Sequence, residues 1–257
     1  MNGDAATLHL TYHRIGNNGS TYPYMLTMLQ FQEHLAIARA LGCDGGHRYL
    51  HPAFTFDDGH GSNYSEAGPL LAENGFSGTF FITASWIQQR AEFMTWSEVK
   101  ALRSSGHGIG SHGWSHKLLT RCTDAALDHE LRRSKDVLEQ KLGAVVDSIS
   151  LPGGRWDRRV LRACAAAGYR SVFTSDPGAR IRMKEGVELV PRFNVPGLFT
   201  AAQLQNLLAV NSSFMYRIRI KHGTKQLARH MMGDRLYHLF WCVFFGWKSD
   251  EDQQSTA

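Results

Sequence analysis

The stretch Ala53-Phe54-Thr55-Phe56-Asp57-Asp58-Gly59 runs from an apolar segment directly into two adjacent carboxylates. The apolar run predicts a buried strand over residues 53–57, and Asp-Asp-Gly is a common way for a chain to leave a strand. Two carboxylates in a partly desolvated place repel each other, and a divalent cation on one of them removes that cost. The stretch therefore predicts a strand end that carries either a plain turn or an ion site.

A second stretch, Ser111-His112-Gly113-Trp114-Ser115-His116, places two imidazoles four positions apart after another predicted strand. An H-x₃-H pair can bring both rings to one side of a helical turn, within reach of one ion. With one of the two aspartates, the pair offers a divalent cation one oxygen and two nitrogens, and the other carboxylate stays free as a base. We expect zinc first, and cobalt, nickel, manganese and iron accept the same donors.

Short apolar runs alternate with helical patterns along the chain, which is typical of a parallel sheet. The predicted strands are residues 8–12, 53–57, 78–82, 108–111, 148–151, 171–174 and 189–193, and the predicted helices are 31–41, 65–74, 96–105, 124–142 and 158–167. Both polar motifs follow strands, and in a βα barrel the carboxyl ends of the strands converge on one mouth. We therefore expect an α/β fold, a distorted (β/α)7 barrel of the TIM-barrel type.

The composition changes near the end of the chain. Residues 217–235 hold six basic residues against only Asp234, and aromatic residues follow as far as Trp247. We expect a barrel domain over residues 1–198 and a helical, basic and aromatic C-terminal extension over 199–257. The extension either packs on the barrel or lies on a membrane surface.

The bulk numbers narrow the class of protein. A formal net charge of +5 over 257 residues favours acidic partners only slightly, and the absence of an aromatic-rich nucleic-acid motif argues against a nucleic-acid partner. Cys43, Cys122, Cys164 and Cys242 form no C-x-x-C pair, which argues against a zinc ribbon or a redox motif. No secretory signal pattern and no long apolar span is present, so we expect a cytoplasmic protein with reduced thiols.

Together the motifs resemble the polysaccharide deacetylase family, the NodB homology domain of carbohydrate esterase family 4. The family reads T-F-D-D-G, matched by residues 55–59, and H-[ST]-x-x-H, matched by His112 and His116 with Gly113 in place of Ser or Thr. The resemblance spans roughly residues 8–195 and includes residues 10–14, 106–110 and 176–178. It implies Asp57 as the catalytic base, and Asp58, His112 and His116 as metal ligands.

Two departures from the family pattern remain. Its R-x-P-x-G motif reads Ser150-Leu151-Pro152-Gly153-Gly154 here, so the Arg that orients the base is missing, and Arg192 is the first candidate to replace it, before Arg155. No L-x-H motif follows the last strand. A permuted branch of the family, which deacetylates exopolysaccharides, takes its acid histidine from the first strand. That arrangement makes His13 the expected general acid, the alternative being a core histidine bonded to a backbone carbonyl.

The resemblance implies a metal-dependent N-deacetylase that hydrolyses the N-acetyl group of an amino sugar. We expect an N-acetylated glycan or a lipid-linked precursor of a surface polysaccharide as the substrate, met in the cytoplasm or at the inner face of the membrane through the C-terminal segment. Trp114 and Trp156 either stack on a sugar ring or serve packing. The alternatives are a catalytically inactive glycan-binding barrel and an amidase that acts on a non-sugar amide.

Overall fold

The computed structural model describes residues 6–16, 22–42, 48–210 and 212–224, in two compact units, Met1–Ser212 and Ser213–Ala257. The strands are β1 (Thr7–Tyr12), β2 (Arg14–Gly16), β3 (Met25–Thr27), β4 (His51–Phe56), β5 (Gly78–Ile82), β6 (Gly108–Ser111), β7 (Ser148–Ser150), β8 (Ser171–Phe173), β9 (Arg182–Lys184), β10 (Val187–Val190) and β11 (Arg192–Asn194). The α-helices are α1 (Met28–Gly42), α2 (Gly68–Glu73), α3 (Trp96–Ser104), α4 (Asp124–Leu142), α5 (Arg158–Ala166) and α6 (Ala201–Leu208), and the short turns of other helix types are Asn63–Ala67, Leu119–Arg121 and Pro152–Gly154.

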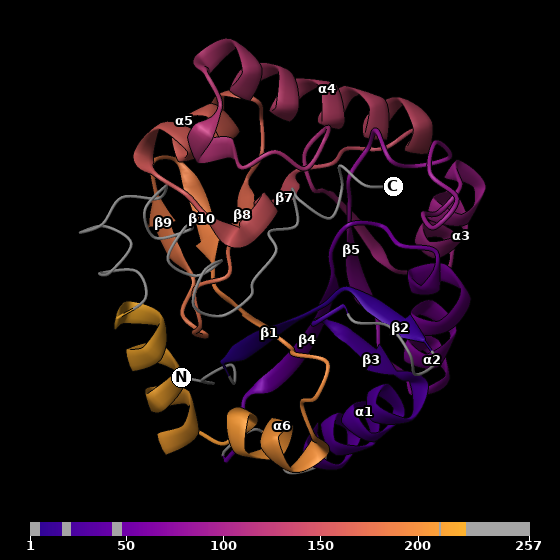
Figure 1. Cartoon of the computed structure of the whole chain (residues 1–257), viewed down its shortest axis with the longest axis vertical. Coiled ribbons are helices and arrows are strands. Elements are labelled where there is room, and N and C mark those ends of the chain that lie inside the picture. The colour runs from indigo at the N-terminus through magenta and orange to yellow at the C-terminus, as the bar shows by residue number, and fades with distance from the viewer. Residues whose placement is uncertain (1–5, 17–21, 43–47, 211, 225–257) are drawn as a thin grey trace, which may run out of the picture. The chain divides into compact units, whose positions relative to one another are not determined.

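The first unit is a barrel of strands surrounded by helices α1 to α5 (Figure 1). The strand order is β11-β1-β4-β5-β6-β7-β8-β10-β9, and only the pair β10–β9 is antiparallel. Pro191, which has no N–H to give to a ladder, separates β10 on β8 from β11 on β1. The last strand therefore changes partner at Pro191 and closes the ring. With β10 and β11 as two halves of one strand, the barrel has the predicted seven parallel positions.

Alternation along β1 and β4 sends apolar side chains outward and polar ones inward. Tyr12 is fully buried, and its ring stacks on Phe56 at 5.5 Å and meets the edge of Phe31 of α1 at 5.2 Å. On the opposite face of β4, Thr55 donates a hydrogen bond to the Leu10 carbonyl. Because side chains alternate with a period of two, Asp57 points to the same side as Thr55, into the mouth of the barrel.

The predicted strands are all present, with ends within two residues of those observed. Helix ends also follow the expected chemistry, since Asp157 caps the first turn of α5 through Val160 N–H and Gly143 ends α4 at a φ of 63°. The strands β2, β3 and β9 were not anticipated. Each lies outside the seven barrel positions, since β2 pairs with β3 in a separate sheet and β9 is the edge strand beyond β10.

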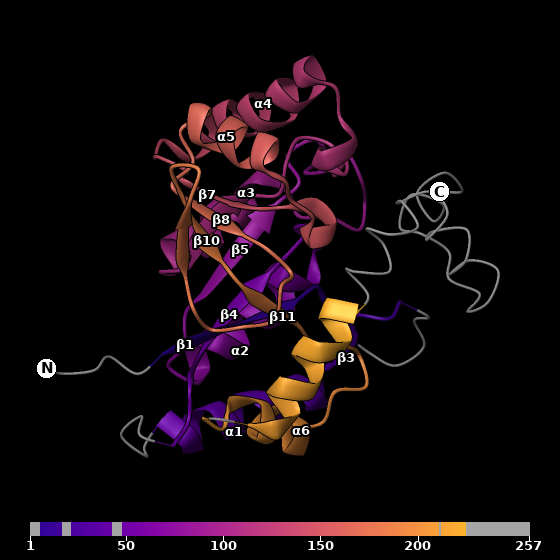
Figure 2. The same cartoon turned by 90° about the vertical axis from the view of Figure 1, so that its left-hand side faces the viewer.

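The end of the first unit lies beyond the composition change near residue 198. Helix α6 packs beside α1, as Figures 1 and 2 both show, and buries Leu204, Leu207 and Leu208. The first unit accordingly runs to Ser212. In the second unit, residues 213–224 form a helix in which Tyr216 and Ile220 are exposed. The rest of the predicted basic and aromatic extension lies outside the described residues.

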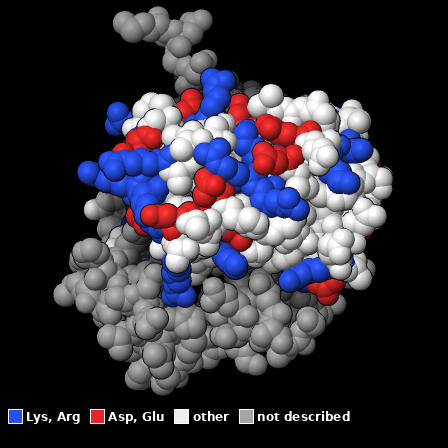
Figure 3. All heavy atoms as spheres, turned by 90° about the horizontal axis from the view of Figure 1, so that it is seen from above, with Lys and Arg blue, Asp and Glu red and all other residues white. Residues whose placement is uncertain are grey.

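The surface around α4 and α5 carries both signs of charge. Seen from the top of Figure 1, basic and acidic side chains lie interspersed (Figure 3). Several form ion pairs, including Arg132 with Asp128 at 2.6 Å and Arg162 with Glu185 at 2.7 Å. Within the described ranges, no helix combines the length and the apolar character needed to cross a lipid bilayer.

Candidate metal and catalytic site

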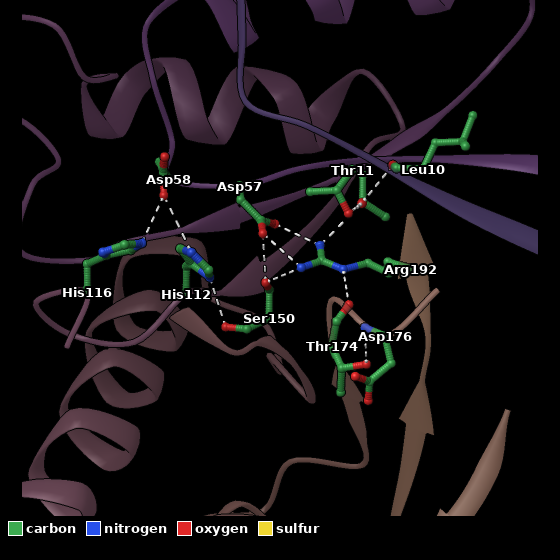
Figure 4. A network of polar contacts seen from close by, with 11 residues as sticks. Leu10, Thr11, Asp57, Asp58, His112, His116, Ser150, Thr174, Asp176 and Arg192 are labelled. Atoms are coloured by element: carbon green, nitrogen blue, oxygen red, sulfur yellow. Dashed lines mark hydrogen bonds and ion pairs between the residues drawn. The ribbon is translucent and has the colours of Figure 1, made fainter. Parts of the chain in front are cut away.

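Three predicted ligand side chains converge at the mouth of the barrel (Figure 4). Asp58 follows β4, while His112 and His116 follow β6, and β5 lies between these two strands. The Nε2 atoms of both histidines lie 3.4 Å from Asp58 Oδ1, and one ligand atom from each of the three residues lies within 4.8 Å of the others. We call these three residues the ligand cluster. The structure brings together the set that the sequence predicted.

The ligand cluster fits a divalent cation. Asp58 Oδ1 is buried and has no hydrogen-bond partner among the described residues. The Nδ1–H of His112 donates to the Ser150 carbonyl at 2.8 Å, which directs the Nε2 lone pair toward Asp58. Tetrahedral zinc with bonds of about 2.0–2.1 Å has ligand atoms roughly 3.3 Å apart, close to the observed spacing. Two nitrogens and one oxygen also suit cobalt, nickel, manganese and iron.

Burial and neighbouring charges shift the pKa of each residue in the ligand cluster. Burial opposes ionisation of Asp58, but the neighbouring imidazoles of His112, His116 and His13 hold its pKa well below the usual range. Burial lowers the pKa of His116 to about 4, against an opposing effect of Asp58. Burial also acts to lower the pKa of His112, but the carboxylates of Asp57 and Asp58 raise it. Asp58 is therefore a carboxylate, and His116 is neutral and free to donate its lone pair.

The backbone at the ligand cluster is strained. Asp58 and His116 have φ values of 77° and 62°, in the left-handed region that non-glycine residues rarely adopt. In contrast, Asp57 and His112 continue the sheet, since their N–H groups donate to Tyr12 and Ile82 carbonyls at 3.0 and 2.8 Å. Strained residues next to a rigid ladder are typical of functional sites.

Asp57 lies beside the ligand cluster and is held from two directions. Arg192 donates from both terminal nitrogens to the two carboxylate oxygens, at 2.8 Å each, and Ser150 Oγ donates to Oδ2 at 2.9 Å (Figure 4). Burial opposes ionisation of Asp57, but Arg192 outweighs it and the pKa falls to about 2. We call Asp57, Ser150 and Arg192 the clamp. It keeps an ionised carboxylate in a buried position.

Arg192 is fully buried and fully satisfied. Its remaining N–H groups donate to the Thr174 carbonyl at 3.1 Å, to Thr55 Oγ1 at 3.2 Å and to Ser150 Oγ at 2.6 Å. A guanidinium has five donors, and all five have acceptors here. Ser150 stands where the family motif has its Arg, so a small side chain on β7 leaves room for a guanidinium that arrives from β11. The structure places the first candidate, Arg192, on Asp57.

His13 follows β1 and lies near both carboxylates. Its charge contributes to the low pKa of Asp57 and Asp58. Its ring stacks on Tyr24 at 5.0 Å, and its Nδ1 atom is buried without a hydrogen-bond partner among the described residues. The alternative for His13 was a core histidine that is bonded to a backbone carbonyl. Its Nδ1 atom forms no such bond within the described part of the chain.

The aromatic residues around the site differ from expectation. A cation lies over one face of each predicted sugar-stacking ring, Arg133 over Trp114 at 5.1 Å and Lys184 over Trp156 at 4.3 Å. Trp86, which the motifs did not mark, packs on His116 at 5.1 Å. Sugar stacking by Trp114 and Trp156 stays a prediction.

Two polar residues of the site were missed at the sequence level. Ser150 was read only as a departure from the family motif, although a polar residue at the end of a buried strand points to the mouth of a barrel. Glu130 lies in the middle of α4 and is 1% exposed. In the sequence, Glu130 stands at helical spacing from Leu127, Leu131 and Ser134. This spacing places an acidic side chain on the buried face of the helix, and it could have marked Glu130.

Part of the chain is similar to known proteins. The polysaccharide deacetylase family model matches residues 51–172. YxkH of Bacillus subtilis (strain 168) is 31% identical over 149 residues, 58% of this chain and 53% of YxkH. A chitin deacetylase of Pestalotiopsis sp. is 31% identical over 120 residues, 47% of this chain and 40% of that protein. The matched region thus spans about half the length of these curated relatives.

Solved structures share the fold. The Streptococcus pyogenes deacetylase PplD, in complex with acetate, superposes with a TM-score of 0.69 at 19% identity, over 79% of this chain and 98% of PplD. IcaB from Ammonifex degensii gives a TM-score of 0.65 at 20% identity, over 79% of this chain and 97% of IcaB. The matched residues 51–172 contain Asp57 and the whole ligand cluster. Within the chain that folds into this barrel, residues 51–172 match the polysaccharide deacetylase family.

Proposed function

We propose that this protein is a metal-dependent N-deacetylase that hydrolyses the N-acetyl group of an amino sugar in a glycan or glycan precursor. One observation carries the proposal, namely an ionised Asp57 held by the clamp directly beside the three donors of the ligand cluster. The two adjacent aspartates do not share a role. Arg192 neutralises Asp57, and the histidines of the ligand cluster surround Asp58.

In this proposal Asp57 is the general base. It accepts the proton of the water that attacks the amide carbonyl, while Arg192 and Ser150 hold its carboxylate in place. A carboxylate with a pKa of about 2 is a weak base, so it needs an acidic water. A divalent ion held by Asp58, His112 and His116 would raise the acidity of that water and polarise the carbonyl.

His13 is the proposed general acid, which would place this chain with the permuted exopolysaccharide deacetylases. It gives a proton to the leaving amide nitrogen, so that acetate and a free amine are the products. Its stacking contact with Tyr24 fixes the plane of the ring.

The substrate class follows from the same reaction. The Pestalotiopsis relative is named a chitin deacetylase, and chitin is a polymer of N-acetylated amino sugars. We propose a glycan of that kind or its lipid-linked precursor, met in the cytoplasm or at the inner face of the membrane. Peripheral contact through the C-terminal segment is part of this proposal, because residues 213–224 combine Arg217, Arg219 and Lys221 with exposed Tyr216 and Ile220.

Acetate release from N-acetylated oligosaccharides tests the function. We expect release by the metal-loaded chain, loss with a chelator, and recovery when zinc or cobalt is added back. Bound metal without release from any acetylated glycan would favour the glycan-binding alternative. Release from non-sugar amides alone would favour the amidase. Deletion from residue 214 onward tests the membrane proposal, and unchanged partitioning onto anionic vesicles would contradict it.

A further inference from the structure

Glu130 is a buried acid on the face that α4 turns toward the barrel. Its side chain is 1% exposed, among Leu127, Leu131 and Ser134. Glutamate is rarely buried to this degree unless other groups satisfy its charge. The identity of its partners therefore shows what the burial serves.

The partners of Glu130 all lie in the loop between the two histidine ligands. Oε2 accepts hydrogen bonds from the N–H groups of Trp114 at 3.0 Å and Ser115 at 2.8 Å, and Oε1 accepts one from the Ser115 hydroxyl at 2.5 Å. Bonds to an ionised acceptor are stronger than neutral ones. One carboxylate thus fixes two of the three residues that join His112 to His116.

Two carbonyls of this loop accept hydrogen bonds from the other side. The carbonyls of Gly113 and Trp114 accept from the N–H groups of Ala84 and Ser85, at 3.2 and 2.9 Å. The loop therefore lies between the 84–85 turn, which donates to two of its carbonyls, and α4, which accepts from the N–H groups of Trp114 and Ser115, while the Gly113 N–H donates to Ser111 Oγ. Without Glu130, two part-buried N–H groups, those of Trp114 and Ser115, would lose their acceptor.

The loop also needs this support because its backbone is strained at His116. Gly113 adopts a φ of 78° without a steric cost, whereas His116 has a φ of 62°. A histidine stays in the left-handed region only when its surroundings over-determine it. Relaxation of the loop would move His116 Nε2 from its position 3.4 Å from Asp58 Oδ1.

We propose that Glu130 is a positioning residue for the ligand cluster. Its three hydrogen bonds set the separation and direction of His112 and His116, and so determine how tightly the cluster binds a divalent ion. Both oxygens are engaged by the loop, so Glu130 acts without being a fourth ligand. The inference rests on the metal-binding part of the proposed function and on no particular substrate.

Cobalt titration of the metal-free, full-length chain tests this role. Glu130→Gln keeps the shape of the side chain but removes its charge and presents an NH₂ group to a donor. We expect roughly 10- to 100-fold weaker Co²⁺ binding, the range typical of groups that orient ligands, and a changed visible absorption spectrum of the bound ion. Glu139→Gln is the matched control, because Glu139 lies on the same helix and accepts the Val146 N–H at 2.9 Å. Its cobalt affinity and spectrum should equal those of the wild type.

Affinity and spectrum unchanged in a folded Glu130→Gln variant would overturn the proposal. If that variant does not fold, Ser115→Ala removes only the hydroxyl donor, and a several-fold loss of affinity supports the same role, whereas no loss contradicts it. A wild-type chain that binds no cobalt overturns both the metal site and this inference. A chain that binds cobalt and loses affinity on Glu130→Gln, but releases no acetate, contradicts the proposed activity and leaves the inference standing.

Discussion

On one side of the barrel mouth, the ligand cluster comes from two short motifs after β4 and β6, whereas the clamp beside it joins residues from β4, β7 and β11. Arg192 is 135 residues from Asp57 in sequence, and Ser150 is 93 residues from it. The ligand cluster depends only on the residue spacing inside two loops and on the pairing of β4 and β6 with β5 between them. The clamp exists only when the last strand closes the barrel.

This difference separates two ways of making a buried charge tolerable. In the ligand cluster, two imidazole nitrogens lie around Asp58 Oδ1, and this oxygen has no hydrogen bond among the described residues. A cation bound by all three atoms would balance the charge of Asp58. In the clamp, a guanidinium and a hydroxyl already satisfy the carboxylate. The two halves should therefore respond differently to mutation, one through metal affinity and the other through catalysis and stability.

Asp57→Asn should produce the largest effect on activity. Loss of a general base typically costs 10²- to 10⁴-fold, so we expect acetate release to fall by roughly 10³-fold. Cobalt affinity should stay within a few-fold of wild type, because the ligand cluster is intact. Asp128→Asn, at an exposed pair on α4, is the control and should change neither value. An equal loss of activity and affinity would show that the two halves are one unit.

Arg192→Ser should destabilise the fold as well as the reaction. It leaves Asp57 buried without its partner, which typically costs about 3–5 kcal/mol in the free energy of unfolding. Urea unfolding of the metal-free chain measures this change. Arg162→Ser, which breaks only an exposed pair with Glu185, should cost less than about 1 kcal/mol.

The double variant Arg192→Ser with Ser150→Arg returns the guanidinium to the family position on β7. We expect it to recover part of the stability and activity that Arg192→Ser loses, because both positions reach Asp57. Recovery would confirm that an arginine on β7 can replace the arginine on β11 as the partner of Asp57. A double variant no better than the single one would show that only an approach from β11 fits.

The same contrast explains what the sequence could predict. Asp57, Asp58, His112 and His116 follow strands whose apolar runs are readable, so their meeting at one mouth followed from barrel topology. Arg192 could be named as a candidate because it lies at the end of the last predicted strand, but its five hydrogen bonds depend on the exchange of partners at Pro191. Pro191 inside the predicted strand 189–193 signals a break, but the sequence pattern does not show which neighbour each half pairs with.

Glu130 shows a second limit of sequence reasoning. A single acid on the buried face of α4 has the same local appearance whether it holds a loop or reaches solvent. Only the fold brings Trp114 and Ser115 onto its oxygens. Likewise β9 was missed because Arg182, Met183 and Lys184 form no apolar run, and only the fold pairs them antiparallel with β10.

Acid should weaken the clamp by a smaller and predictable amount. The pKa of Asp57 is about 2 in the fold, against 3.8 for the free group. Since the folded value is the lower one, its stabilisation is present above pH 4 and is lost as the pH falls through 2. This difference of nearly two pKa units corresponds to about 2 kcal/mol in the free energy of unfolding.

Urea unfolding of the metal-free chain between pH 6 and pH 2 measures this loss. Asp57→Asn should show a pH dependence flatter by about 2 kcal/mol, because the other titrating groups are common to both chains. Equal slopes for both chains would contradict the assignment of a low pKa to Asp57.

Gly113→Ala should have the smallest effect on stability. Because Gly113 lies between His112 and His116, the variant should also change the metal affinity of the ligand cluster. Gly113 has a φ of 78°, where an L-residue costs about 1–2 kcal/mol, and an added Cβ would lie 3.4 Å from Glu130 Oε2. Gly143→Ala is the matched control, because its φ of 63° carries the same backbone cost while nothing lies within 4 Å of the added atom. Both variants should lose similar stability in urea unfolding, but only Gly113→Ala should also bind cobalt more weakly, by a few-fold. Equal cobalt affinities would mean that the loop can shift without moving His112 and His116, and the ligand cluster would then be no more dependent on its surroundings than the two motifs alone suggest.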